Sequence, residues 1–146
     1  MKYEKRNDLI TMLASSCVVI SFFLPWVGRL TGPNIVSYSM KAFDMSSWSN
    51  EWIIIGTFGL LFALSPIVFH VLNLITIVSG RSRKLCLTCV SLPILIWVAL
   101  FVVAALQIGE LPILEGGSYK IGFIATIIGQ IIALFHQSVS FNTRSV

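Results

Sequence analysis

The chain has 146 residues, of which 56% are hydrophobic and only 11% are charged, and its formal net charge is +4. The mean hydropathy is +0.90, which is higher than a soluble domain of this length carries. The composition therefore excludes a water-soluble domain with an ordinary active site, and it predicts a membrane protein.

Four apolar runs are long enough to cross about 30 Å of hydrocarbon as helices, at about 1.5 Å per residue. They cover about residues 9–27, 52–79, 85–108 and 119–137, and they leave outer loops at 28–51 and 109–118. We therefore predict an all-α fold, in which residues 1–146 form a single integral membrane domain with four transmembrane helices. The first run ends without a small-residue cleavage site, so we expect it to be retained rather than removed as a signal peptide.

Lysine and arginine are divided unequally between the two sides of this predicted bundle. One side carries Lys2, Lys5, Arg6, Arg81, Arg83, Lys84 and Arg144, and the other carries Arg29, Lys41 and Lys120. By the positive-inside rule both termini lie in the cytoplasm, and we expect the chain to reside in a bacterial cytoplasmic (inner) membrane. The positive charge then serves orientation and contact with lipid headgroups, so no nucleic-acid partner is expected.

The first outer loop is long enough to form a small extracytoplasmic cap. Its turn signal at residues 32–34 and the alternation of apolar and polar residues over 36–43 predict a short hairpin or edge strand. Tyrosine and tryptophan side chains prefer the membrane interface. We therefore expect the outer interface to contain Trp26, Trp48, Trp52 and Tyr119. The candidate partner-binding residues of this loop are Tyr38, Phe43, Asp44 and Trp48.

The first run closes with Phe22-Phe23-Leu24-Pro25-Trp26, and the loop continues to Ala42-Phe43-Asp44-Met45. Over roughly the first third of the chain, this arrangement resembles a class of small bacterial four-helix membrane proteins with a Phe-Leu-Pro-Trp end to the first helix. The resemblance implies the four-helix layout and no particular activity. The layout is similar to that of claudin-like tetraspans in topology only, because the first loop has no cysteine.

The second apolar run carries a polar face. Ser65, His70 and Asn73 project within an arc of roughly 140° on a helix, and His70 and Asn73 are one turn apart. Two interpretations stay open. A neutral His70 is satisfied by Asn73, by a serine hydroxyl or by the carbonyl that Pro66 frees, or else these residues line a path for a proton, an ion or a ligand. No acidic or basic residue lies in the middle of any run, which counts against ion-coupled transport.

The last run segregates small and polar residues from large apolar ones. The stripe contains Gly122, Ala125, Thr126, Gly129, Gln130 and Ala133, followed by His136 and Gln137. Small residues at helical spacing let another backbone approach closely, and Thr and Gln form hydrogen bonds between helices. The stripe therefore predicts either packing inside one bundle or a seam with another protomer or another membrane protein.

No pattern of residues indicates catalysis. Cys86-Leu87-Thr88-Cys89 is a single Cys-x-x-Cys pair, and although His136 is expected at a similar depth, we predict neither a metal site nor a cofactor. We expect a non-enzymatic membrane protein, such as an accessory subunit or an immunity-type protein. It would act by lateral helix association or outer-loop binding, with a second copy or another membrane protein. The alternative is a small oligomeric channel or carrier lined by the polar face of the second helix.

Overall fold

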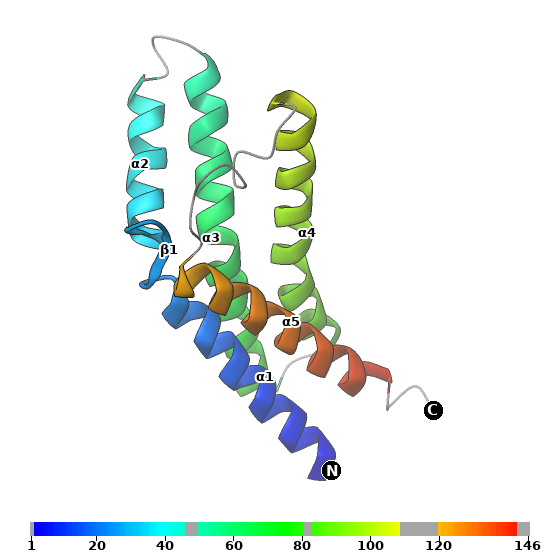
Figure 1. Ribbon diagram of the computed structural model, residues 1–146. Coiled ribbons are helices and arrows are strands. Elements are labelled where there is room, and N and C mark those ends of the chain that lie inside the picture. Colours follow the sequence, from blue (N-terminus) through cyan, green and yellow to red (C-terminus); the bar gives the residue numbers. More distant parts are fainter. Residues whose placement is uncertain (1, 46–49, 81–82, 109–119, 143–146) are drawn as a thin grey trace.

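The computed structural model describes residues 2–45, 50–80, 83–108 and 120–142 (Figure 1). Within these residues the chain forms five helices and one short antiparallel strand pair, so the predicted all-α character is confirmed. In chain order the elements are α1 (Lys2–Ser21), β1 (Pro25–Val27), β2 (Leu30–Thr31), α2 (Gly32–Asp44), α3 (Asn50–Val78), α4 (Arg83–Ile108) and α5 (Ile121–Asn142).

Three of the described helices are long and apolar enough to cross a membrane. The spans are Glu51–Val78 in α3, Arg83–Val103 in α4 and Ile121–Val139 in α5. Helix α1 does not reach this standard by itself, because its first turns are rich in charged residues. It also ends at Ser21, whereas the sequence predicted a helix that continues to residue 27.

Pro25 explains why α1 ends early. Proline lacks a backbone N–H and disfavours helical geometry at the residue before it. The chain therefore turns after Ser21, and β1 pairs with β2 around Gly28, whose φ of 57° suits a tight turn. The Ser21 carbonyl, to which an N–H at position 25 would have bonded in a helix, accepts a hydrogen bond from Trp26 Nε1 at 2.8 Å.

The predicted hairpin or strand over residues 36–43 is wrong, because this segment is part of α2. Pro33 stands in the first turn, where its fixed φ favours a helix start. The buried side of α2 packs against two glycines of α3. A Cβ at Gly56 would lie 2.8 Å from the Ser39 carbonyl oxygen, and one at Gly59 would collide with Ser39 Oγ. Close packing on α3 therefore outweighs the alternating pattern.

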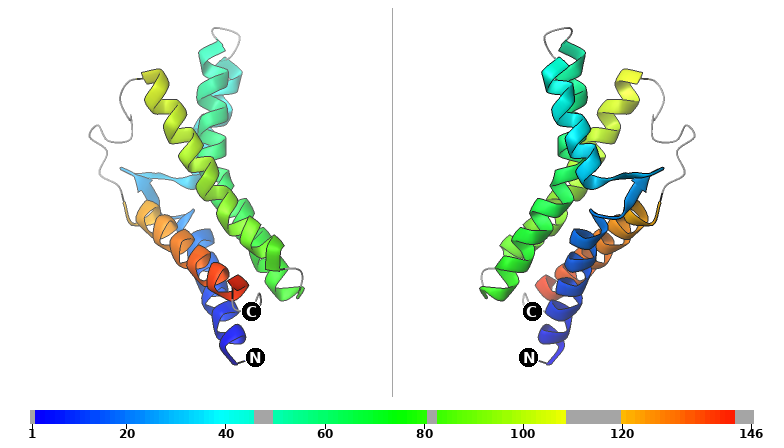
Figure 2. Two further views of the ribbon diagram at one scale, coloured as in Figure 1. Left: turned by 90° about the vertical axis from the view of Figure 1, so that its right-hand side faces the viewer. Right: turned by 90° about the vertical axis from the view of Figure 1, so that its left-hand side faces the viewer.

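The helices form two groups that cross each other (Figures 1 and 2). Helices α1 and α5 lie side by side and antiparallel, at an incline to the antiparallel pair α3 and α4. Helix α2 lies along the first half of α3, at the end where α3 and α4 extend past the start of α5. The first turn of α1 and the last turn of α5 are at the opposite end, together with the last turn of α3 and the first turn of α4.

An aromatic core lies where the two groups cross. Phe62 stacks on Trp97 with ring centroids 4.8 Å apart, and Trp97 stacks on Phe123 at 5.5 Å. Trp26 is fully buried against these rings, so its indole packs inside the protein instead of contacting lipid headgroups. The turn at Pro25 folds the indole inward, and its bond to the Ser21 carbonyl removes the need for water. Of the other predicted interface aromatics, Trp52 is exposed, while Trp48 and Tyr119 lie outside the described residues.

Candidate functional site

Contacts in the aromatic core fix which residues of α3, α4 and α5 lie at the same level. Because α3 and α4 are antiparallel and Phe62 stacks on Trp97, His70 is level with Cys89, each eight residues from its ring. By the same count Pro66 is level with Pro93. On α5, Gln130 follows Phe123 by seven residues, so it lies on the same side of the helix and about 10 Å further from the aromatic core. His70, Cys89 and Gln130 therefore belong to one layer.

Ser15 of α1 joins two polar side chains of α3 in this layer. Its Oγ lies 3.0 Å from His70 Nδ1 and accepts a hydrogen bond from Asn73 Nδ2 at 2.9 Å. All three side chains are fully buried. The Ser15 hydroxyl has one proton, and the arrangement that uses every group has it donate this proton to His70 Nδ1. The imidazole proton is then on Nε2.

Four buried polar atoms in and next to this layer have no hydrogen-bond partner among the described residues. They are Ser65 Oγ, His70 Nε2, Asn73 Oδ1 and Gln130 Nε2. A buried polar group without a partner costs about 1–3 kcal/mol, and a native structure rarely leaves several of them together. These atoms therefore make the layer the strongest candidate for a functional site.

The core is divided at the level of the two prolines. On one side it is aromatic. On the other side, toward the α3–α4 connection, all four long helices contribute buried polar or cysteine side chains, namely Thr11, Ser15, His70, Asn73, Thr76, Cys86, Cys89, Gln130 and Gln137. Ala14, Val90 and Ala133 pack together within the same half. We call this half the polar core.

Residues of the predicted polar lining lie inside the single chain. The predicted serine partner of His70 is Ser15, which the sequence argument did not identify. The carbonyl freed by Pro66 is that of Phe62, and Trp97 Nε1 donates to it at 3.0 Å, so this carbonyl does not serve His70. The missed signal is the pair Thr11 and Ser15, which are one turn apart on the same side of α1.

The small-residue stripe on α5 faces α1 and β1. A Cβ at Gly129 would lie 2.6 Å from Val18 Cγ2 and 3.1 Å from the Ala14 carbonyl oxygen. A Cβ at Gly122 would lie 2.7 Å from the Pro25 carbonyl oxygen. Thr126 Oγ1 and Ser21 Oγ are 2.6 Å apart. Gln130 and Ala133 are also buried, and Ala125 is half-buried. The stripe is thus covered within the chain.

The candidate loop residues separate into two kinds. Tyr38 and Asp44 are exposed on α2, and Lys41 Nζ lies 5.7 Å from the centre of the Tyr38 ring. Phe43 is half-buried, and its ring packs beside Gly56 of α3, so its role is structural. Trp48 lies outside the described residues. Of the candidate loop residues that the structure describes, Tyr38 and Asp44 are therefore the ones exposed to a partner.

Cys86 and Cys89 are buried free thiols, and Cys17 is an exposed one. His136 is half-buried, and its ring packs edge-on against Phe135. Among the described residues no three His, Cys, Asp or Glu side chains lie close enough to hold a metal ion. Comparison with protein-family models, curated proteins and solved structures finds no match, so the geometry alone guides the functional argument.

Proposed function

We propose that this protein is a non-enzymatic membrane protein with four spans that binds a partner protein through its outer end, as an accessory subunit or an immunity-type protein does. The span of α5 has 19 residues and measures about 28 Å, which matches the hydrocarbon thickness. Lys120 precedes this helix, and its backbone N–H donates to the Trp26 carbonyl at 3.0 Å. The turn from β1 to β2, with Arg29, therefore belongs at the same membrane interface as Lys120.

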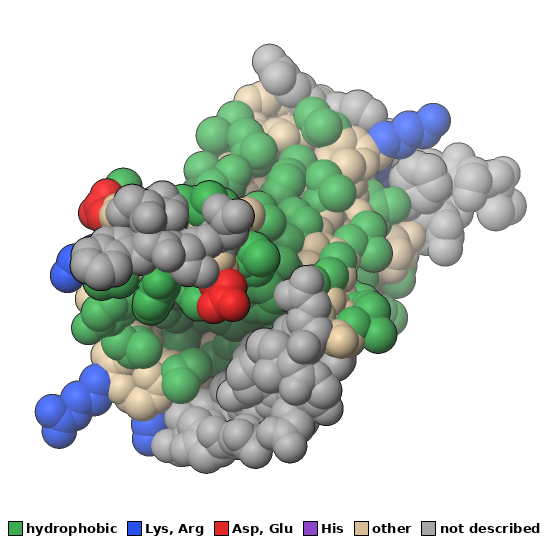
Figure 3. Space-filling view, turned by 90° about the horizontal axis from the view of Figure 1, so that it is seen from above, with side chains coloured by type: hydrophobic (Ala, Val, Ile, Leu, Met, Phe, Trp, Pro, Cys, Tyr) green, Lys and Arg blue, Asp and Glu red, His purple; other side chains and the backbone are tan. Residues whose placement is uncertain are grey.

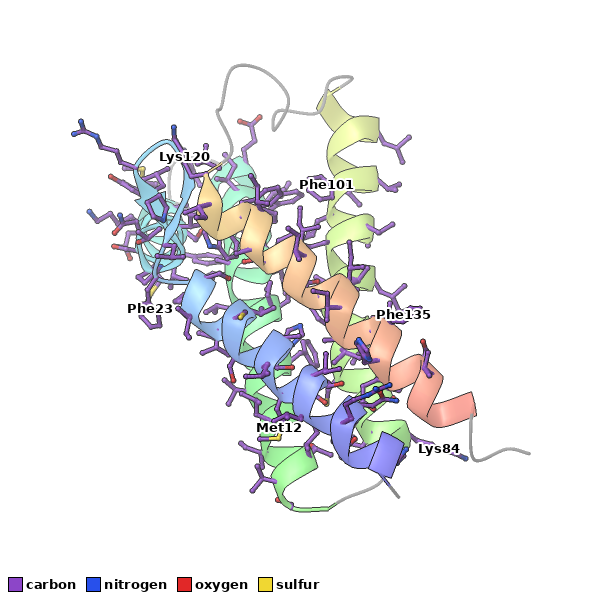
Figure 4. All side chains as sticks on the ribbon, turned by 60° about the horizontal axis from the view of Figure 1, so that its bottom comes forward. Met12, Phe23, Lys84, Phe101, Lys120 and Phe135 are labelled. Atoms are coloured by element: carbon purple, nitrogen blue, oxygen red, sulfur yellow. The ribbon has the colours of Figure 1, made fainter. Side chains whose placement is uncertain are left out.

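The other interface follows from the opposite ends of the helices. Lys84 lies at the start of α4 and Lys120 at the start of α5, at opposite ends of the molecule (Figure 4). Helix α1 and the turn after it run alongside α5, which supports counting them as the fourth span. The excess of basic residues at the Lys84 end supports a cytoplasmic location for that end.

Helix α3 is longer than the membrane is thick. Its span of 28 residues measures about 42 Å, which exceeds the hydrocarbon thickness by about 12 Å. Helix α2 packs beside this excess length. The outer end therefore consists of α2, the first turns of α3 and the last turns of α4.

Exposed apolar side chains on this outer end carry the proposal. On α4, Leu106 is 80% exposed. The other exposed apolar residues at this level are Trp52, Ile53, Ile54 and Ile55 of α3. Seen from above, hydrophobic side chains make up much of the described surface of this end, and acidic side chains form only small spots (Figure 3). Contiguous apolar surface beyond a membrane marks an interaction site.

The two competing modes of action have less support. Lateral association through α5 would need a free stripe, but α1 covers it. An oligomeric channel lined by α3 would need its polar face between protomers, but Ser65, His70 and Asn73 are buried within one chain. The polar residues of α2, including Asn34, Lys41 and Asp44, are exposed and would form the rim of the partner site.

Co-purification with a mass measurement tests the proposal. The wild-type protein, extracted from its native membrane in mild detergent, should have a mass above that of one chain and carry a second protein. The double variant Ile54→Asn, Leu106→Asn should lose this second protein and keep its helicity, while the control Ile54→Val, Leu106→Ile should retain it. A complex that survives the Asn substitutions, or a wild-type protein with only its own mass, would contradict the proposal.

A further inference from the structure

A partner site at the outer end does not explain why polar side chains are buried in the polar core. Among its buried side chains, His70 Nε2, Asn73 Oδ1 and Gln130 Nε2 have no partner, although each lies where lipid supplies none. Ser65 Oγ, next to Pro66, has none either. These atoms are on α3 and α5, and the register of both helices against Trp97 brings His70 and Gln130 to about the same level, with Asn73 one turn further along α3 and Ser65 nearer the aromatic rings.

We propose that the layer around His70 is a binding site for ordered water inside the bundle. With Ser15 donating to Nδ1, His70 Nε2 presents a proton, and Gln130 Nε2 is a second donor. Asn73 Oδ1 is an acceptor. The Cys89 carbonyl on α4, at the level of His70, lacks its usual helical donor because position 93 is proline, and we include it in the proposed site as a second acceptor. Two donors and two acceptors match the four hydrogen bonds of a water molecule.

The chemistry of the layer favours water over an ion. Its side chains are two neutral amides, an imidazole, a thiol and hydroxyls, and no carboxylate, lysine or arginine is among the buried side chains of the described core. Buried waters typically have about three polar partners each, which this layer supplies. An anion or a cation would leave either the acceptors or the donors unused.

Buried polar side chains continue from this layer toward one end of the bundle. Toward the α3–α4 connection, the buried side chains Thr11, Thr76, Cys86 and Gln137 continue the polar core. In the other direction the stacked rings of Phe62, Trp97 and Phe123 close the interior, and Trp26 packs across them. The proposed water site thus belongs to the polar core, which ends where the aromatic core begins. It does not depend on the partner surface proposed for the outer end.

Hydroxyl-radical footprinting tests the presence of water directly. Radicals produced from water by X-ray radiolysis oxidise the side chains next to bound water, including buried ones. In the full-length protein in detergent, His70 should be oxidised faster than Trp97, although tryptophan is the more reactive side chain and both are buried. Oxidation of Trp97 at a rate equal to or above that of His70 would overturn the proposal.

The substitution Gln130→Met gives a second test, because the melting temperature should change in opposite directions depending on whether the layer around His70 contains water. Methionine has nearly the same volume without the amide. If Gln130 holds water, its loss should lower the melting temperature and the oxidation rate of His70. If the layer is dry, removing an unpartnered amide should raise the melting temperature. Leu134→Met, a half-buried apolar position on the same helix, is the matched control and should change neither. An unchanged or raised melting temperature of Gln130→Met would overturn the proposal.

Discussion

Two tryptophan side chains donate hydrogen bonds to carbonyl groups whose usual helical donors are missing because of two prolines. Pro25 and Pro66 remove the N–H groups that would bond the carbonyls of Ser21 and Phe62 in a helix. Trp26 Nε1 donates to the first carbonyl at 2.8 Å, and Trp97 Nε1 donates to the second at 3.0 Å. The Ser21 carbonyl also accepts a hydrogen bond from the Leu24 N–H at 3.1 Å. In a bilayer an unpaired carbonyl is costly, so the Trp97 indole stabilises the break that Pro66 makes in α3.

Replacing Trp97 with phenylalanine tests this pairing. The ring remains large and aromatic, but the Phe62 carbonyl loses its donor and stays buried. We expect the free energy of unfolding to fall by about 1–3 kcal/mol. The measurement is thermal or denaturant unfolding in detergent. Trp52→Phe, at an exposed position, is the control and should change the stability by less than about 0.5 kcal/mol. Equal effects of the two substitutions would refute the role of the indole N–H.

Ser15 has a similar role for side chains, because His70 and Asn73 meet at its hydroxyl. Ser15→Ala should lower the stability by about 1–3 kcal/mol, since two buried groups lose a partner. Ser16 is the matched control, being a half-buried neighbour on another face of α1. Unfolding of both alanine variants in the same detergent checks the prediction. If Ser16→Ala lowers the stability as much as Ser15→Ala does, the hydrogen bonds at Ser15 do not contribute specifically to stability.

At the scale of elements, close helix pairs explain the shape of the bundle. Gly129 and Gly122 bring α5 onto α1 and β1, and Gly56 and Gly59 bring α2 onto α3. Lipid gives no hydrophobic driving force for helix contact, so the pairs rely on close packing. The large side chains point away, as Figure 4 illustrates for Phe23 and Phe135, which are both exposed.

Gly129→Leu tests the packing of α5. The new side chain would meet Val18 and the α1 backbone at Ala14, so we expect a loss of about 1–3 kcal/mol from overpacking. Because α1 belongs to the same chain, the mass of the solubilised protein should not change. Ile128→Leu, at an exposed position of the same helix, should be nearly silent in both measurements. A drop in mass without a loss of stability would instead indicate a seam between protomers.

For the whole molecule, the depth of the turn from β1 to β2 in the membrane determines which helices lie in the hydrocarbon. If this turn and Lys120 mark the outer interface, then the C-terminal part of α2 is outside the hydrocarbon, while its Ile35 and Val36 pack against the aromatic core. Helix α3 then crosses the membrane and extends past it. The exposed face of α2 agrees with this placement, since it carries Asn34, Ser37, Lys41 and Asp44. The same placement puts the polar core in the cytoplasmic half of the membrane.

Labelling in sealed cells tests this placement. A cysteine introduced at Ser37, which is exposed on α2, should react with a membrane-impermeant thiol reagent added outside. A cysteine at Ser79, which is exposed at the end of α3, should react only after the cells are opened. The wild-type protein gives the background from Cys17, Cys86 and Cys89. Reaction at Ser79 in sealed cells would reverse the orientation.

Local sequence properties determined the long apolar helices. The predicted ranges 52–79, 85–108 and 119–137 correspond to α3 (Asn50–Val78), α4 (Arg83–Ile108) and α5 (Ile121–Asn142). Hydropathy is a property of each segment by itself, because every segment must meet the same lipid wherever its neighbours lie. The polar face of α3 and the stripe of α5 were visible for the same reason.

Only the tertiary structure decided what covers these faces. A stripe of small residues predicts a close neighbour, but its sequence is the same whether the neighbour is α1 or another protomer. The choice of helix for α2 depends on Gly56 and Gly59, which follow it in the chain, and the inward turn of Trp26 depends on rings of three other helices. The meeting of Ser15 with His70 joins residues 55 positions apart. Such contacts follow from how the helices pack together, which no single segment specifies.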